Sequence, residues 1–134
     1  MAERATPRQP AYLAAAGLAV FAVLSLTACS SEAEDALYEG FKCSRVASQL
    51  GRAKDADNAM ENVREAALEV EKSVPPDQRA RHAMRATERF QDDVPLHKLS
   101  TAGKGELLSS IYGSSTCQRL YMDPSLVRRT PRNK

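Results

Sequence analysis

The sequence has no tryptophan, and aromatic residues make up only 5% of its 134 positions. Glycine and proline are sparse, with 6 and 7 residues, which excludes collagen-like and low-complexity chains. Neither sign of charge dominates, because 19 basic residues stand against 17 acidic ones, and this excludes a broadly basic nucleic-acid coat protein. The length is typical of one domain, so a multi-domain enzyme and a polytopic membrane protein are excluded as well.

Patterns that indicate catalysis or metal binding are also missing. There is no Cys-x-x-Cys pair, and His82 and His97 stand alone in the sequence. A serine or cysteine nucleophile needs a positioned base, which the sequence does not indicate. The Gly103-Lys104-Gly105 segment lacks the spacing of a phosphate-binding loop. We therefore predict no metal, no cofactor, no small-molecule substrate, no nucleic-acid partner and no enzymatic activity.

The most specific pattern lies in the first thirty residues. Arg4 and Arg8 precede an uncharged apolar run over residues 11–24, which is followed by Ser25-Leu26-Thr27-Ala28-Cys29. A basic start, a short apolar segment and small residues before a cleavage site are typical of a secretory signal peptide. Within it, Leu26-Thr27-Ala28-Cys29 resembles the lipobox of bacterial lipoproteins.

The resemblance implies that residues 1–28 are a cleaved signal peptide and that Cys29 carries a diacylglycerol, with a further acyl chain such as palmitate on the new amino terminus. Each buried methylene strengthens membrane attachment by about 0.8 kcal/mol, so two or three chains hold firmly. Ser30 and Ser31 resemble the signal that sorts lipoproteins to the outer membrane, here on its periplasmic face. The alternative is an uncleaved anchor helix over residues 11–28, which is at the short limit for a span.

The three cysteines fit an oxidising compartment. If Cys29 is lipidated, Cys43 and Cys117 remain as a pair, and an even remainder in a secreted chain predicts a disulfide. The loop closed by this bond would hold about 75 residues, which the chain-entropy model values at roughly 4 kcal/mol. A buried free thiol at Cys43 is the alternative.

Hydrophobic periodicity after the signal predicts helices and no strands. A short tether over residues 29–35 leads into a helical domain over residues 36–122. We expect helices over 34–50 and 54–73, a third from Pro76 or Asp77 to about residue 92, and a fourth from Ser100 or Thr101. The apolar sets that define their buried faces are Ala36, Cys43, Val46, Ala47 and Leu50; Ala56, Ala59, Met60, Val63, Ala67 and Val70; Ala80, Ala83, Met84, Thr87 and Phe90; and Leu107, Leu108, Ile111, Cys117 and Tyr121.

The predicted fold class is therefore all-α. We expect a small bundle of three to four helices, with Gly51 and Val74-Pro75-Pro76 ending the first two. Many of the expected core positions are alanine, so the core is thin and gains from a disulfide between the first helix and the last.

Two clusters of positive charge are candidates for contact with an anionic partner. Arg79, Arg81, Arg85 and Arg89 recur at helical spacing, but nearby acids favour a solvated helix face there. Residues 123–134 form a basic tail, expected to be flexible, which contains Arg128, Arg129, Arg132 and Lys134 and could contact anionic lipid or a partner. A disordered, solubilising end is an equal alternative for the tail.

Together these patterns predict a membrane-anchored lipoprotein of the bacterial cell envelope. Its expected role is a non-enzymatic interaction or accessory module that binds an envelope protein. The first alternative is a periplasmic inhibitor or immunity-type protein, and the second is a cell-wall contact protein that acts through the basic tail.

Overall fold

A computed structural model describes residues 20–127, with side chains described from residue 32 onward. This part of the chain is all-α, with seven α-helices, two short 3-10 helices and no strand. The elements are α1 (Val20–Gln49), α2 (Ala53–Asn62), α3 (Arg64–Ser73), η1 (Pro76–Gln78), α4 (Arg79–Asp93), η2 (Leu96–Lys98), α5 (Thr101–Tyr112), α6 (Ser115–Leu120) and α7 (Pro124–Val127).

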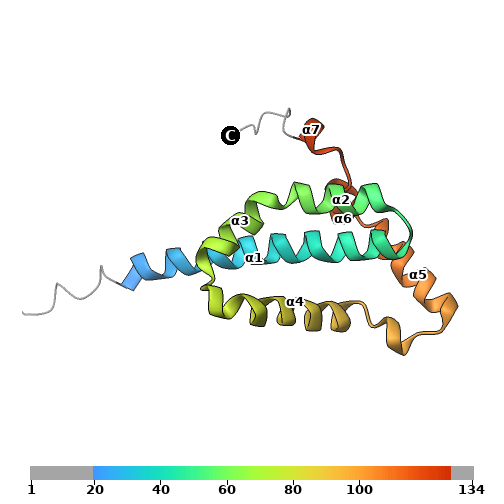
Figure 1. Cartoon of the computed structure of the whole chain (residues 1–134), viewed down its shortest axis with the longest axis horizontal. Helices are drawn as coiled ribbons and strands as arrows, with labels where there is room; N and C mark the ends of the chain where they lie inside the picture. Colours follow the sequence, from blue (N-terminus) through green and yellow to red (C-terminus); the bar gives the residue numbers. More distant parts are fainter. Residues whose placement is uncertain (1–19, 128–134) are drawn as a thin grey trace, which may run out of the picture.

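Helix α1 is the central element of the domain. In Figure 1, α2 and α3 return along one side of α1, whereas α4 runs along the opposite side. Gly51 ends α1 with φ +72°, in the left-handed region that glycine adopts without strain, as the sequence predicts. The amide of Arg52 then donates to the carbonyl of Ala47 (2.9 Å), which satisfies an end carbonyl of the helix.

Two apolar clusters form on different sides of α1. The first joins α1 to α2 and α6 and contains Cys43, Ala47, Ala56, Ala59, Cys117 and Tyr121. The second joins α1 to α4 and α5 and contains Tyr38, Val46, Phe90, Val94 and Leu108. Small side chains dominate the first cluster, which confirms the expectation of a thin core there.

The predicted disulfide is confirmed. Cys43 on α1 and Cys117 on α6 are bonded, with their Cα atoms 5.3 Å apart, and they are 74 positions apart in sequence. Both residues are buried in the first cluster. The hydroxyl of Tyr121 donates to the backbone carbonyl of Cys43 (2.9 Å), and burial raises the pKa of that phenol to about 12.

The single helix expected over residues 54–73 is divided at Val63. Val63 has φ −104° and ψ 11°, and it separates α2 from α3. Its side chain packs against Gly40 of α1, where a Cβ atom would lie only 2.7 Å from Val63 Cγ1. The break lets both segments follow α1, and Gly40 permits the close approach.

The fourth expected helix is also divided. Ser100 accepts a hydrogen bond from the amide of Gly103 (3.2 Å) and caps α5, as predicted. Ser114 then accepts from the amide of Cys117 (3.3 Å) and caps α6. The segment thus turns after Gly113, which directs Cys117 toward α1.

Some boundaries and core positions differ from expectation. Helix α1 begins at Val20 rather than at residue 34, and Ala33, expected in the tether, is buried with 6% exposed. Ala36 is exposed, whereas Tyr38 takes a place in the core. The first residues of the expected flexible tail form α7, where the amide of Ser125 donates to Asp123 (2.8 Å).

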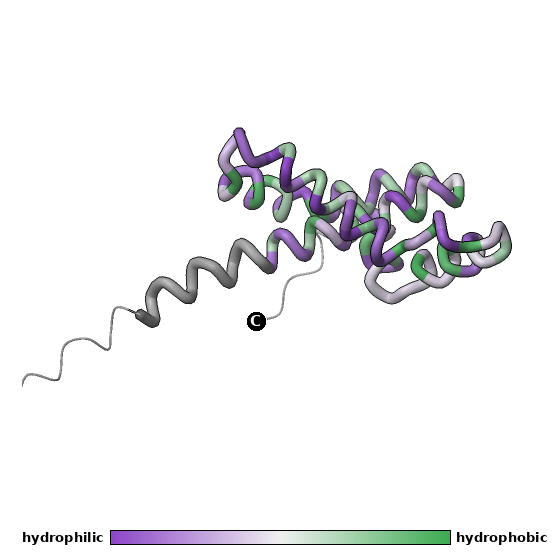
Figure 2. The backbone as a smooth tube through the Cα atoms, turned by 90° about the horizontal axis from the view of Figure 1, so that it is seen from below, coloured by the Kyte–Doolittle hydropathy of each residue, from purple (hydrophilic) through white to green (hydrophobic). Residues whose placement is uncertain are grey.

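Hydrophilic and hydrophobic positions alternate every few residues along the helices coloured in Figure 2. In the part of the chain described here, no helix combines the length and the apolar character needed to cross a bilayer.

Candidate functional site

Helix α4 leaves most of its predicted buried face uncovered. Among the expected core residues, Phe90 is 7% exposed, but Met84 is 62% exposed. Ala80, Ala83 and Thr87 are exposed as well, so this part of the core prediction was wrong. The physical reason is that α4 packs on the second cluster only near its C-terminal end, through Phe90 and through Val94 just beyond it.

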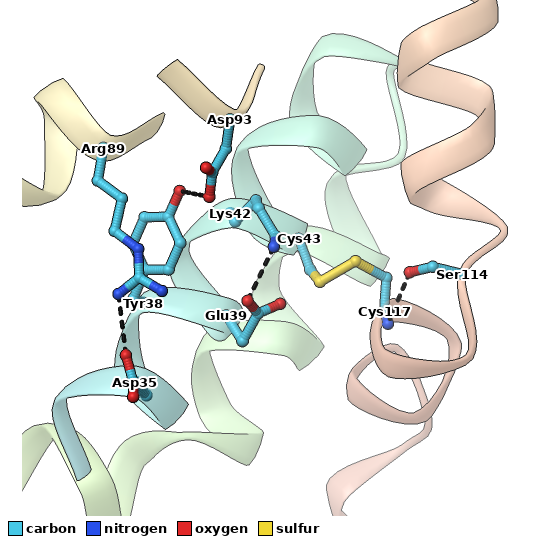
Figure 3. Close-up of polar contacts among 9 residues, drawn as sticks. All are labelled: Asp35, Tyr38, Glu39, Lys42, Cys43, Arg89, Asp93, Ser114 and Cys117. Carbon is cyan, nitrogen blue, oxygen red and sulfur yellow. Dashed lines mark hydrogen bonds and ion pairs between the residues drawn. A yellow bond between two sulfur atoms is a disulfide. The ribbon is translucent and has the colours of Figure 1, made fainter. Parts of the chain in front are cut away.

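A polar cluster fixes that end of α4 to α1 (Figure 3). The hydroxyl of Tyr38 donates to Asp93 Oδ2 (2.6 Å), and the guanidinium of Arg89 lies 3.9 Å from the centre of the Tyr38 ring. Arg89 also donates to Asp35 Oδ1 (2.9 Å). Burial and the hydrogen bond to Asp93 raise the pKa of Tyr38 well above its usual value.

Asp35 affects both the pKa of Arg89 and the way in which Arg89 is held. The hydrogen bond to Asp35 raises the pKa of the Arg89 guanidinium, so it stays charged throughout the physiological range. Both partners of this ion pair are half exposed or more, so it adds less than about 1 kcal/mol to stability. Its structural effect is to orient the last turns of α4 against α1.

An open groove lies between α3 and the stretch of α4 that stands away from the core. Its volume is about 530 Å³. The apolar part of its lining comes from α1 (Leu37, Phe41), the end of α2 (Met60), α3 (Ala67, Val70), Val74, and α4 (Ala83, Ala86). We call this feature the α3–α4 groove.

Charged side chains form the rim of the α3–α4 groove. Arg79 pairs with Glu71, with Nη1 3.3 Å from Oε1, and also donates to the Glu71 carbonyl (3.2 Å). Arg85 and His82 line the α4 side, and Glu34 lines the α1 side. None of these three side chains forms a hydrogen bond or ion pair with a described residue. The groove therefore has an apolar floor and one arginine, Arg85, with no partner in the part of the chain that the structure describes.

A second hollow lies between α1 and the α5–α6 segment. Its volume is about 560 Å³, and polar residues such as Ser110, Ser114 and Thr116 contribute to its walls. Its lysine, Lys42, is already paired with Glu39 at 2.8 Å (Figure 3). This hollow offers less apolar contact than the α3–α4 groove.

Chemically, the α3–α4 groove is suited to binding. His82 is the histidine in its lining, and the hydroxyl of Thr87, which also lines the groove, donates to its own helix at the Ala83 carbonyl (3.1 Å). No group of three or more metal-ligating side chains comes together within the described residues.

The residues singled out in the sequence are not brought together into one site. Arg79 and Arg89 of the arginine run are paired with Glu71 and Asp35, not with the neighbouring acids of their own helix. His97 is exposed in η2, and Lys104 lies in the first turn of α5, so the glycine-flanked segment is helical.

For two sets of predicted site residues the structure describes no side chains. The backbone of Cys29 belongs to α1, but its side chain is not among those described. Arg128, Arg129, Arg132 and Lys134 lie outside the described residues.

Comparisons with protein-family models, with curated proteins and with solved structures find no match for this chain. The class of this protein is described by its fold alone. It is an all-α domain closed by a disulfide, with an open apolar groove beside α1.

The groove itself was not anticipated from the sequence. Four of its apolar residues, Met60, Ala67, Val70 and Ala83, belong to the sets expected in the closed core of a bundle, because helical periodicity shows that a face is apolar but not what covers it. One usable signal was the density of arginines on α4, since guanidinium groups at four positions discourage close packing of that helix.

Proposed function

We propose that the protein is a lipid-anchored protein of the bacterial cell envelope that acts by binding an envelope protein. The anchor is Cys29, and the expected location is the periplasmic face of the outer membrane. The observation that carries the binding role is the outer face of α4, where Ala80 and Met84, two residues of the expected core-facing set, are exposed.

That outer face combines apolar contact with charge. Ala80 and Met84 are exposed one helical turn apart, and Arg81 and Glu88 lie beside them on the surface. Neither Arg81 nor Glu88 forms a hydrogen bond or ion pair with a described residue. A partner that presents an apolar patch edged by a carboxylate opposite Arg81 would complement this face.

The disulfide and the lipobox support the proposed compartment. Disulfides persist in the periplasm and are rare in the cytosol. Ala33 is buried in the domain only four positions after Cys29, and a helix rises about 1.5 Å per residue. A lipid on Cys29 would therefore hold the domain close to the membrane surface.

The anchor is tested with Cys29→Ser in the full chain, expressed in a bacterial host. We expect the intact mass to lose its acyl chains and the protein to leave the membrane fraction. Replacing both Cys43 and Cys117 with alanine is the matched control, because it removes cysteines without removing the anchor. A native mass without acyl chains, together with unchanged membrane attachment of the variant, would reject the lipidation.

The binding role is tested by a photocrosslinking amino acid placed at Met84 in living cells. We expect one dominant protein adduct, which Arg81→Glu weakens by removing the charge that faces the partner's carboxylate. The same amino acid at Glu106, exposed on α5, is the control. Equal adducts from both positions would show that the outer face of α4 has no specific partner.

A further inference from the structure

The α3–α4 groove has the size and lining of a site for one small apolar ligand. Its volume of about 530 Å³ lies within the range of roughly 300–1,000 Å³ typical of small-molecule sites. Leu37 and Phe41 form the floor, one turn apart on α1, and Val70 faces them from α3. These side chains remain partly exposed in the domain, so a bound hydrocarbon chain would gain by covering them.

One end of the groove is closed, which favours a narrow occupant over a helix of a partner protein. Helix α3 ends at Ser73 and α4 begins at Arg79, so only a short connection separates the two walls. The double contact of Arg79 with Glu71 ties the walls together at that end. A helix with its side chains is about 10–12 Å wide, much wider than a hydrocarbon chain, so the closed end favours the chain.

The rim of the groove specifies the charge of the ligand. Arg79 and Arg89 already have carboxylate partners, but Arg85 has none among the described residues. Glu34, on the α1 side, would repel an anion. One monovalent anionic head is therefore favoured on the α4 rim, next to Arg85.

We propose that the α3–α4 groove binds a long-chain fatty acid, with its hydrocarbon chain over Leu37 and Val70 and its carboxylate at Arg85. A carboxylate is a better match than the larger head of a lysophospholipid, because only one guanidinium on the rim, that of Arg85, has no carboxylate partner among the described residues. This inference goes beyond the proposed function and is independent of the outer face of α4.

The test uses the full chain in isolated membranes and palmitic acid that carries a photoreactive diazirine and an alkyne tag. Without added ATP the free acid is not activated, so a label found on the domain reports binding and not acyl transfer. Peptide mass spectrometry should place the label on the groove segments of α3 and α4. Unlabelled palmitate should compete, whereas an alkyl trimethylammonium of the same chain length should not.

Two variants are expected to lose the label. Ala83→Phe, at an exposed position, fills the groove, and Arg85→Glu should weaken labelling about tenfold or more by removing a charge-assisted contact. Lys104→Glu makes the same change of charge on α5, outside the groove, and should label like the native protein. Formation of the Cys43–Cys117 bond in each variant confirms that it has folded.

Several outcomes would overturn the proposal. These are a label spread over α5 and α6, equal labelling of Arg85→Glu and Lys104→Glu, and competition by the cationic amphiphile. Competition by lysophosphatidylethanolamine but not by palmitate would assign the groove to a lysophospholipid and reject the fatty acid. Cys29→Ser is labelled in whichever fraction holds it, soluble or membrane, and its groove should label like that of the native protein, so failure of the proposed function is distinguishable from failure here.

Discussion

At the scale of single residues, Gly40 decides how closely the helices approach. It lies on α1 opposite Val63, at the point where α2 ends and α3 begins. A hydrogen in place of a methyl group lets both methyl groups of Val63 rest against the backbone of α1. The contact explains why this glycine is tolerated inside a long helix despite its low helix propensity.

We expect Gly40→Ala to lower the free energy of unfolding by about 1–3 kcal/mol, because the added methyl group overlaps Val63 in a packed core. The measurement is urea unfolding followed by circular dichroism. Gly105→Ala is the matched control: nothing lies within 4 Å of its added methyl group, so it should raise stability by about 0.5–1 kcal/mol. Equal effects of the two substitutions would show that the Val63 contact is unimportant.

The second residue-scale test concerns the same contact from its other side. Val63→Ala creates room for the new methyl group, so the Gly40→Ala/Val63→Ala double variant should be more stable than the sum of the single effects predicts. If the effects of the two substitutions on the free energy of unfolding simply add, the effect of Gly40→Ala does not come from its contact with Val63.

At the scale of elements, the position of α6 depends on polar contacts at both of its ends. Ser114 caps its first turn. At the other end the amide of Asn62, on α2, donates to the carbonyls of Leu120 (2.9 Å) and Met122 (2.8 Å). A six-residue helix has little stability of its own, so these contacts decide its place.

We expect Ser114→Ala to cost about 1 kcal/mol of stability, because the amide of Cys117 loses its hydrogen-bond acceptor. In this variant, backbone hydrogen exchange should become faster in α6 than in the native protein and should change little in α4. Ser109→Ala, at an exposed position inside α5, removes a hydroxyl without removing a cap and serves as control. Unchanged exchange in α6 would mean that the disulfide alone holds this helix.

At the scale of the whole molecule, the disulfide joins α1 to a segment 74 positions later in the sequence. Three of the six buried residues in the first cluster around it are alanine, so the cluster offers limited apolar area. A cross-link over such a long loop restricts the unfolded chain strongly. We therefore expect the bond to compensate for the thin core around α6.

Replacing Cys43 and Cys117 with alanine should lower the free energy of unfolding by roughly 2–5 kcal/mol. The native protein treated with reductant should approach the same stability in the same urea titration. Retention of full stability in both samples would show that packing, and not the bond, closes the domain.

Much of the fold was predictable from local patterns. Helical periodicity found the helices, Ser100 and Gly51 marked two of their ends, and the parity of the cysteines indicated the bond between Cys43 and Cys117. These signals depend on neighbouring residues or on counting, so they need no knowledge of the third dimension. The break at Val63 was missed because it depends on Gly40, which is distant in sequence.

The candidate site was largely beyond prediction. The amphipathic pattern of α4 correctly indicated an apolar face, but Met84 is exposed and the neighbouring alanines border a groove. Whether a face is covered depends on the place and angle of other helices. The partners of Arg79 and Arg89, on α3 and α1, were hidden for the same reason.

The sequence by itself determined the helical class, the disulfide and the lipobox resemblance at Cys29, because each of these follows from residue type, spacing or number. Only the tertiary structure decided that α4 packs at one end and stands away at the other, which opens the α3–α4 groove and leaves Arg85 without a partner among the described residues. The reason is that packing depends on two surfaces. The sequence of a helix shows which of its faces is apolar, but it does not show which other helix covers that face.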